Sequence, residues 1–253
     1  MAFSIISLPR LAFAAATLFL ATLILSPLVI IASLLFSEEP AFRLARLWAT
    51  IVAKGMGITF SFHGTENITP GTSYIVTPNH QSNADILGLL SKLPVKFRWV
   101  IKKELLRVPL FGHALSRTGA IALDRSDRTQ AVSKLQQGES KLKDGWSILI
   151  YPEGTRTSDG NIQSFKKGGF MMAVHTGIPI LPVTCNGAFK ILPKKTIWLR
   201  PGHISFTIGA PIPTAGLTEA DVPDLMEKTS NAIMEHFDPD YDPFARNGIP
   251  GKS

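Results

Sequence analysis

The feature that most constrains this chain is an apolar run near its N-terminus. From Leu11 to Phe36, LAFAAATLFLATLILSPLVIIASLLF, no residue carries a charge. At about 1.5 Å rise per residue, a helix of this length reaches roughly 39 Å, more than the ~30 Å hydrocarbon core of a bilayer. We therefore expect the run to span a membrane or to lie in one leaflet. A cleaved signal peptide is the alternative, although its apolar region is usually about 7 to 15 residues long.

A second segment, AFRLARLWATIVAKGMGITF, follows at once. Four of its residues recur at helical spacing and form one narrow polar stripe: Arg43, Arg46, Thr50 and Lys54. This pattern indicates an interfacial helix whose basic groups reach lipid phosphates, or else an ordinary helix packed on a soluble domain. Pro27 and the break at Glu38-Glu39-Pro40 leave two topologies open, a single span or a two-helix hairpin in one leaflet.

Charge and cysteine content limit the partners and the compartment. The 253 residues carry a formal charge of +7, with a pI near 9.6, which favours an anionic partner. Lys and Arg are dispersed, so nucleic acid is the weakest candidate and membrane lipids or phosphorylated small molecules are stronger. Cys185 is the single cysteine and the histidines do not cluster, so we expect no disulfide, no metal and no cofactor. More basic residues follow the apolar run than precede it, which favours an inner (cytoplasmic) membrane protein with its catalytic domain on the cytoplasmic side.

From about Ile58, short apolar runs alternate with amphipathic stretches, which predicts an α/β sheet with helices on its faces. We expect membrane-anchoring helices over 1–57, an α/β domain over 58–237 and an irregular tail over 238–253. The expected strands are Ser73–Val76, Arg98–Ile101, Gly119–Leu123, Ser147–Tyr151, Ile180–Thr184 and His203–Ile208. The expected helices are Ala84–Leu93, Leu110–Arg117, Arg128–Lys143, Gly168–Thr176 and Glu219–His236.

The stretch VTPNHQSNADILG carries the first chemical signal. An apolar strand ends in a Pro-Asn turn that presents His80, and helical spacing resumes around Asp85. A histidine is the natural general base near neutral pH, and a carboxylate on its other nitrogen would fix the tautomer and stabilise the imidazolium. We expect Asp85, in the first turn of the helix, to reach back to His80, although such a pair alone is a weak signal.

Two further stretches offer cations for a phosphate. In IKKELLRVPLFGHALSRTGAIALDR, Lys103 and Arg125 are candidates, although both charges could simply be solvated. In ILIYPEGTRTSDG, Gly154 permits a tight turn and Arg156 offers a two-pronged donor. Glu153 is ambiguous, because it could pair with Arg156 or order the turn instead of touching a substrate.

Together with TGIPILPVTCNG, these stretches resemble the four blocks of the glycerophospholipid acyltransferase family, most closely its 1-acyl-sn-glycerol-3-phosphate acyltransferases. The matching residues are Asn79-His80 to Asp85, Lys103 through Gly112 to Asp124-Arg125, Pro152 to Arg156, and Ile178 to Val183. The departures are mild and concern donor and acceptor preference. They are Tyr151 in place of the usual Phe, Thr157 in place of Ser, and Ala122-Leu123 in place of Phe-Ile.

The resemblance implies a mixed sheet flanked by helices and a defined reaction. An acyl chain would pass from acyl-CoA or acyl-acyl carrier protein to the free hydroxyl of lysophosphatidic acid, giving phosphatidic acid for phospholipid biosynthesis. His80 would be the catalytic base and Asp85 its orienter. The residues implied at the substrate phosphate are Arg156, Lys103, Arg125, Thr155, Gly154 and Glu153.

Several alternatives remain open. The acceptor could be another lysophospholipid or a lyso-aminolipid, and the chain could instead be a non-catalytic membrane-binding lipid module. A serine hydrolase would need a nucleophile such as Ser82, but no GxSxG motif occurs. A covalent route through Cys185 is disfavoured, because a cysteine beside a buried strand is usually inert.

Overall fold

The computed structural model describes residues 8–123, 142, 145–196 and 198–245. Within these ranges, seven strands form one sheet in the order β1-β7-β6-β2-β5-β3-β4. All neighbours pair in parallel except β6 and β7, which are antiparallel, so the predicted mixed sheet is confirmed. The strands are β1 (Ile58–His63), β2 (Ile75–Pro78), β3 (Lys96–Lys102), β4 (Ile121–Leu123), β5 (Trp146–Leu149), β6 (Ile180–Asn186) and β7 (Gly202–Ile208).

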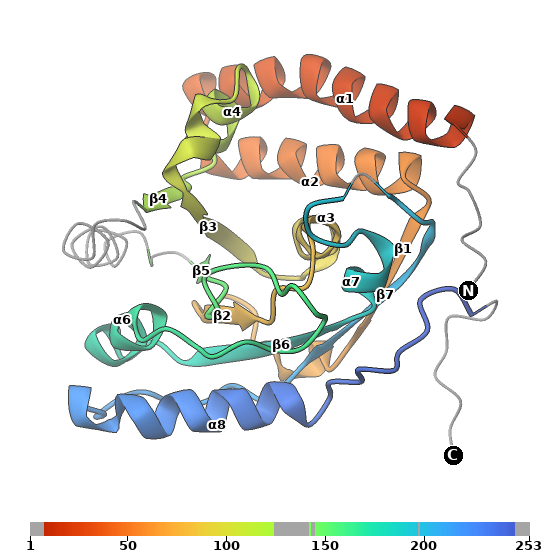
Figure 1. Ribbon diagram of the computed structural model, residues 1–253. Coiled ribbons are helices and arrows are strands. Elements are labelled where there is room, and N and C mark those ends of the chain that lie inside the picture. Colours follow the sequence, from red (N-terminus) through yellow and green to blue (C-terminus); the bar gives the residue numbers. More distant parts are fainter. Residues whose placement is uncertain (1–7, 124–141, 143–144, 197, 246–253) are drawn as a thin grey trace.

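Helices cover both faces of this sheet (Figure 1). On one face α3 lies next to the strands, with α2 above it and α1 outermost; α6 and α8 cover the opposite face. The α-helices are α1 (Leu8–Leu35), α2 (Glu38–Gly55), α3 (Asn83–Lys92), α4 (Phe111–Arg117), α6 (Gly168–Thr176), α7 (Ala188–Ile191) and α8 (Val222–Met234). Short 3-10 helices are η1 (Thr65–Asn67), η2 (Lys103–Arg107) and η3 (Glu219–Asp221).

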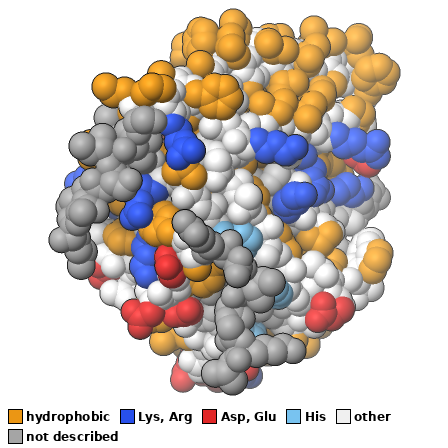
Figure 2. Space-filling model, turned by 90° about the vertical axis from the view of Figure 1, so that its right-hand side faces the viewer, with side chains coloured by type: hydrophobic (Ala, Val, Ile, Leu, Met, Phe, Trp, Pro, Cys, Tyr) orange, Lys and Arg blue, Asp and Glu red, His pale blue; other side chains and the backbone are white. Residues whose placement is uncertain are grey.

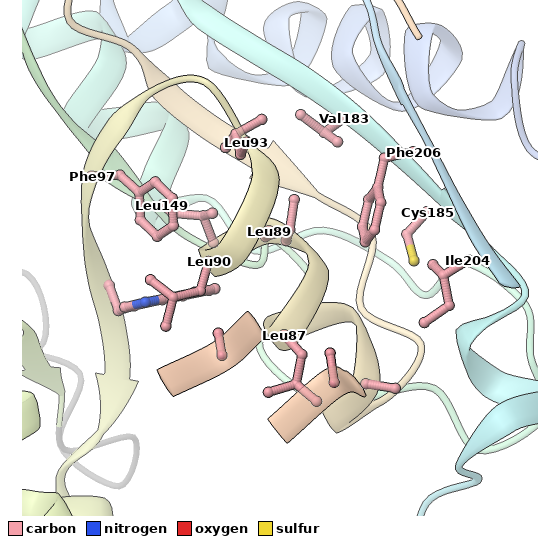
Figure 3. Close-up of a cluster of buried hydrophobic side chains, with 14 of the residues drawn as sticks. Leu87, Leu89, Leu90, Leu93, Phe97, Leu149, Val183, Cys185, Ile204 and Phe206 are labelled. Atoms are coloured by element: carbon pink, nitrogen blue, oxygen red, sulfur yellow. The ribbon is translucent and has the colours of Figure 1, made fainter. Parts of the chain in front are cut away.

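The core between α3 and the sheet fixes the position of that helix. Four leucines of α3 and its C-terminal end point into a cluster that also holds side chains of β3, β5, β6 and β7 (Figure 3): Leu87, Leu89, Leu90 and Leu93. Gly88 allows the closest approach, because a Cβ there would lie 2.4 Å from Cε2 of Phe206. The packing of α3 on the sheet therefore fixes the position of this helix, and with it the position of Asp85.

The N-terminal segment forms a hairpin of two helices. α1 continues unbroken through Pro27, and the chain turns between α1 and α2 at Phe36 and Ser37. The two helices pack closely, since a Cβ on Gly55 would lie 2.4 Å from Cγ2 of Thr17. Trp48 Nε1 also donates to Thr22 Oγ1 at 3.0 Å. The N-terminal segment is therefore a hairpin of two packed helices.

The outer face of α1 is apolar and exposed. Among the described residues, α1 is the one helix long and apolar enough to cross a membrane, a test that buried core helices and signal sequences also pass. Only 28% of its most apolar window is buried inside the protein. Figure 2 shows this apolar cap with Lys and Arg side chains directly beneath it. The exposed side chains of α1 include Phe13, Phe19, Leu23, Ile24, Leu28, Ile31, Leu34 and Leu35.

The polar residues expected along one face of α2 are only partly exposed. Arg43 is exposed and pairs with Glu39 at 2.7 Å. Arg46 was expected on the same face, but its guanidinium turns inward and donates to the carbonyl oxygen of Ser91 at 3.0 Å. Phe42 and Val52 are buried against the domain. The alternative reading, a helix packed on the α/β domain, is therefore correct for much of α2.

The sequence did not predict one of the strands, and one expected helix falls outside the residues that the structure describes. No strand was expected over Ile58–His63, at the start of the α/β domain, yet β1 pairs in parallel with β7 at the edge of the sheet. The helix expected over Arg128–Lys143 lies outside the described residues, apart from residue 142. The six expected strands and the other expected helices are confirmed, with ends that differ by a few residues.

Candidate active site

The topology of the sheet brings the two most informative sequence stretches together. β2 and β5 are parallel neighbours, so their carboxyl ends meet at the same edge. His80 follows β2, and the segment from Tyr151 to Arg156 follows β5. Ligands of open α/β sheets usually bind outside these strand ends. Asn79 extends the pairing toward β6, because its side chain exchanges two hydrogen bonds with the backbone of Cys185, at 3.0 and 2.6 Å.

His80 and Asp85 form the pair that their spacing predicted. His80 Nδ1 lies 3.1 Å from Asp85 Oδ2. That oxygen also accepts hydrogen bonds from the backbone N–H groups of Gln81 and Ser82, at 2.9 and 2.8 Å. Asp85 is wholly buried in the first turn of α3, where the positive end of the helix favours a carboxylate. With Nδ1–H directed at Asp85, Nε2 is left to take a proton from a hydroxyl.

Tyr151 also contacts this pair, which its sequence position did not reveal. Its ring stacks on the His80 imidazole with centroids 3.6 Å apart and planes 14° apart. Its hydroxyl donates to Asp85 Oδ1 at 2.8 Å. Trp99 of β3 stacks in turn near Tyr151, with centroids 6.1 Å apart. In the sequence, the feature that could have indicated this contact is the position of Tyr151 at the end of the strand expected over Ser147–Tyr151.

Glu153 is held within the protein by two backbone hydrogen bonds. Its carboxylate is buried and accepts from the backbone N–H of His80 at 2.6 Å and from that of Gln163 at 2.9 Å. The backbone N–H of Thr157 donates to the His80 carbonyl at 2.9 Å. These contacts occupy both carboxylate oxygens, and they agree with the alternative that Glu153 orders the turn.

Burial raises the pKa of Glu153 to about 7, against the two backbone hydrogen bonds that lower it. A raised folded-state pKa means that the protonated group stabilises the fold, and that this stability is lost as the pH rises through about 7. We expect the free energy of unfolding to fall by up to about 3 kcal/mol between pH 5 and pH 8 from this group. Glu153→Gln should flatten that slope, as measured by urea unfolding in detergent at both pH values.

The exposed Glu227→Gln on α8 is the matched control and should keep the parental slope. The amide that replaces the Glu153 carboxylate has a single acceptor oxygen for the two backbone N–H groups, so overall stability of that variant can drop. The change in the free energy of unfolding with pH, and not its absolute value, therefore tests whether Glu153 titrates. A Glu153→Gln protein with the parental slope would contradict a titrating Glu153.

Arg156 is one of three cationic side chains at or beside the turn that follows β5. Gly154 has a φ of +69°, and a Cβ there would lie 3.0 Å from the Lys166 side chain. Lys194, which the sequence reasoning missed, donates to Thr155 Oγ1 at 3.1 Å and to the Arg156 carbonyl at 2.8 Å. The structure thus places Lys166 and Lys194 beside the turn that carries Arg156.

The other two predicted phosphate residues are less directly placed. Lys103 is exposed at the start of η2, and the cation of this segment that lines the cavity beside His80 is Lys102. Arg125 lies outside the described residues. Neither position therefore adds to the geometry around Arg156.

A cavity of about 740 Å³ adjoins these residues. Its walls come from the N-terminal hairpin, α3, β3 and α4 and are mostly apolar, while His80, Thr155 and Arg156 contribute polar groups. The volume is within the range of small-molecule sites. Such a cavity fits a molecule with one long apolar chain and one charged head group, held beside a base.

Rival nucleophiles and metal sites find little support in the described part of the chain. Ser82 is buried as the N-cap of α3, and its hydroxyl donates to the Leu192 carbonyl at 2.7 Å. Cys185 is buried within β6, and burial followed by the Asp85 charge raises the pKa of its thiol well above the usual value. Among the described residues no three His, Cys, Asp or Glu side chains are grouped to hold a metal ion.

Comparison with known proteins identifies the class. A model of the family described as Acyltransferase matches residues 59–186. The matched range contains most of the sheet, the His80–Asp85 pair and the Arg156 turn. The fold and the site therefore define an α/β acyltransferase.

The similar proteins narrow this class. The chain is 35% identical over 190 residues to the 1-acyl-sn-glycerol-3-phosphate acyltransferase of Pseudomonas aeruginosa, covering 75% of this chain and 72% of that protein. It is 30% identical over 196 residues to the alpha form of Homo sapiens, covering 77% and 69%. The crystal structure of the 1-acyl-sn-glycerophosphate acyltransferase PlsC from Thermotoga maritima matches with a TM-score of 0.77 and 26% identity, covering 90% and 94%. The chain belongs to the glycerophospholipid acyltransferase family, and the resemblance seen in the sequence is confirmed.

Proposed function

We propose that the protein transfers an acyl chain from acyl-CoA or acyl-acyl carrier protein to the free hydroxyl of 1-acyl-sn-glycerol-3-phosphate. The product is phosphatidic acid, an intermediate for phospholipid biosynthesis. The observation that carries the proposal is that His80, which is paired with Asp85, and Arg156 both line one apolar cavity. The names of the similar proteins support the same acceptor.

The reaction needs no nucleophile from the protein, because a thioester is already activated. The acceptor hydroxyl attacks the thioester carbonyl while His80 Nε2 takes the hydroxyl proton. The carbon–oxygen bond forms, the carbon–sulfur bond breaks, and the thiolate leaves with the proton that the imidazolium returns. Asp85 stabilises the imidazolium between these two steps, as its 3.1 Å contact with Nδ1 permits. Neither a metal nor a cofactor takes part in this scheme.

Arg156 grips the acceptor phosphate and so places the acceptor hydroxyl near His80. A guanidinium binds a phosphate through two parallel charge-assisted hydrogen bonds, which fixes orientation as well as affinity. Lys194, Lys166 and the neighbouring Lys102 add positive charge beside this head-group site. General-base action contributes about 10²- to 10⁴-fold and positioning several kcal/mol more.

The assay that tests this proposal uses purified protein, labelled acyl-CoA and labelled acyl-acyl carrier protein. The acceptor panel contains lysophosphatidic acid, glycerol 3-phosphate, another lysophospholipid and a lyso-aminolipid. We expect labelled phosphatidic acid as the main product with at least one donor. Preference for another acceptor would overturn the proposed substrate, and no transfer to any acceptor would favour a non-catalytic lipid-binding module.

We propose further that α1 lies in the plane of one leaflet of the inner membrane, with the catalytic domain on the cytoplasmic side. α1 packs lengthwise on α2, and α2 is itself packed against α3. The exposed apolar face of α1 sits above basic side chains, an order that matches acyl chains above lipid phosphates (Figure 2).

Replacing three exposed apolar residues of α1, Phe19, Ile24 and Ile31, with Gln should release the protein from membranes. Each large apolar side chain contributes about 1.5 to 3 kcal/mol of transfer free energy, so we expect at least a tenfold weaker partition onto anionic lipid vesicles. Vesicle co-sedimentation measures this partition. Met234→Gln, at an exposed position of α8, is the matched control and should bind as the parent does. Equal sedimentation of the triple variant and the parent would contradict the proposed contact.

A further inference from the structure

Tyr151 contacts both members of the His80–Asp85 pair. Its ring lies nearly parallel to the imidazole, at 3.6 Å between centroids. Its hydroxyl donates at 2.8 Å to Asp85 Oδ1, whereas His80 contacts the other carboxylate oxygen, Oδ2. One side chain thus fixes the plane of the base and satisfies the second oxygen of its orienter.

We propose that Tyr151 is a positioning residue of acyl transfer, which holds the Asp85 carboxylate in place and moderates its pull on the His80 proton. The proposal rests on the proposed function, in which His80 is the general base. A donor to Oδ1 spreads the negative charge of Asp85 over one more hydrogen bond, which weakens the hold of Oδ2 on an imidazolium. Tyr151 therefore acts on the base through Asp85 as well as through ring stacking.

The protonation of Tyr151 supports a constant donor role. Burial, followed by the charge of Asp85, raises the pKa of the Tyr151 phenol well above its ordinary value. The phenol therefore keeps its proton throughout the working pH range, and its hydroxyl can only donate to a carboxylate. An ionised phenol would instead repel Asp85.

Other titratable or charged groups face the pair from the surrounding elements. Glu153, after β5, accepts from the backbone N–H of His80. Cys185 of β6 is also close enough to feel the Asp85 charge, and burial keeps its thiol protonated by raising its pKa. Lys102 of β3 and Arg156 line the same cavity as His80. Of these, Glu153 is the group whose pKa, about 7, falls in the range of an enzyme assay.

Tyr151→Phe tests the proposal because it keeps the stacked ring and removes only the hydroxyl. The Asp85 carboxylate then pulls more strongly on the imidazolium, so the acid limb of kcat/KM should move to higher pH by about 0.5 to 1 unit. We expect activity about three- to tenfold lower on the acid limb of the pH profile and within about threefold of the parent on the alkaline plateau. Phe is the usual residue of the family pattern here, which agrees with a folded and active variant.

Substituting 3-fluorotyrosine at position 151 provides the opposite test. Fluorine makes the phenol a stronger donor, so the acid limb should move to lower pH. Tyr74→Phe is the matched control, since the Tyr74 hydroxyl accepts from the Thr69 N–H at 3.0 Å and does not contact the pair. Tyr74→Phe should leave the acid limb of kcat/KM where it is in the parent. The shift of that limb caused by Tyr151→Phe should persist when Glu153 is also changed to Gln.

NMR separates failure of this proposal from failure of the proposed function. The His80 ring resonance, assigned by its loss in His80→Ala, should titrate at higher pH in Tyr151→Phe whether or not any acceptor turns over. If neither the His80 ring titration nor the acid limb of kcat/KM moves in Tyr151→Phe, then Tyr151 contributes only packing and the proposal is wrong. An equal loss of activity at every pH would lead to the same conclusion. Normal turnover by His80→Ala would overturn the proposed function instead.

Discussion

His80→Ala is expected to lower kcat for acyl transfer by about 10²- to 10⁴-fold while the protein stays folded. The reason is the loss of the group that takes the hydroxyl proton, which no neighbouring side chain is placed to replace in the described structure: Asp85 is wholly buried behind His80, and Glu153 is held by backbone hydrogen bonds. The measurement is the initial rate of labelled phosphatidic acid formation at saturating lysophosphatidic acid. Thermal unfolding of the same preparation shows whether the fold is intact.

His175→Ala is the matched control for this variant. His175 is on α6, on the opposite face of the sheet from α3, and contacts Glu219 at 2.9 Å. Its loss removes a histidine of similar polarity without touching the cavity, so turnover should be parental. If His80→Ala turns over at the parental rate, His80 is not the base and the proposed mechanism is wrong.

Arg156→Ala is expected to lower kcat/KM for lysophosphatidic acid by about 10²- to 10³-fold. Loss of charge-assisted hydrogen bonds to a phosphate removes about 3 to 4 kcal/mol, and the acceptor hydroxyl is then no longer held near His80. Arg156→Lys should recover only part of this loss, because an ammonium keeps the charge but not the two-pronged geometry. Steady-state kinetics with varied lysophosphatidic acid give kcat and KM separately.

Three comparisons make the Arg156 result specific. Arg200→Ala removes an arginine that stacks over Phe244, 3.6 Å from the ring centroid, and should leave kcat/KM unchanged. Lys194→Ala should give a smaller loss than Arg156→Ala, since Lys194 donates to the backbone and hydroxyl of this turn. With monoacylglycerol, an acceptor without a phosphate, wild type and Arg156→Ala should differ little. An equal loss on both acceptors would contradict a phosphate-binding role.

Much of the fold was predictable because the hydrophobic pattern of the α/β domain is regular. The runs that became β2, β5 and β6 are short, apolar and closed by turn residues, which is the pattern of buried parallel strands. β1 was missed because ITFSFH follows an amphipathic helix directly and its pairing partner, β7, lies far along the chain. Pairing at such separation leaves no local signal.

The candidate site was predictable where a contact is local and not where it depends on the sheet. His80 and Asp85 are joined across one helical turn, so their contact follows from spacing. Glu153 could not be assigned from sequence, since its partners become neighbours only when the β5 turn packs beside β2. The same holds for Lys194, which reaches the Arg156 turn from beyond α7.

The cavity walls have a consequence for how this protein can be handled. Leu18, Leu25 and Val29 of α1 belong to the lining of the cavity that also contains His80. Removing the first helix to obtain a shorter fragment would therefore remove part of the cavity wall and open the cavity to water. Because α1 contributes to the cavity wall, loss of activity in such a truncation would not by itself be evidence for membrane binding.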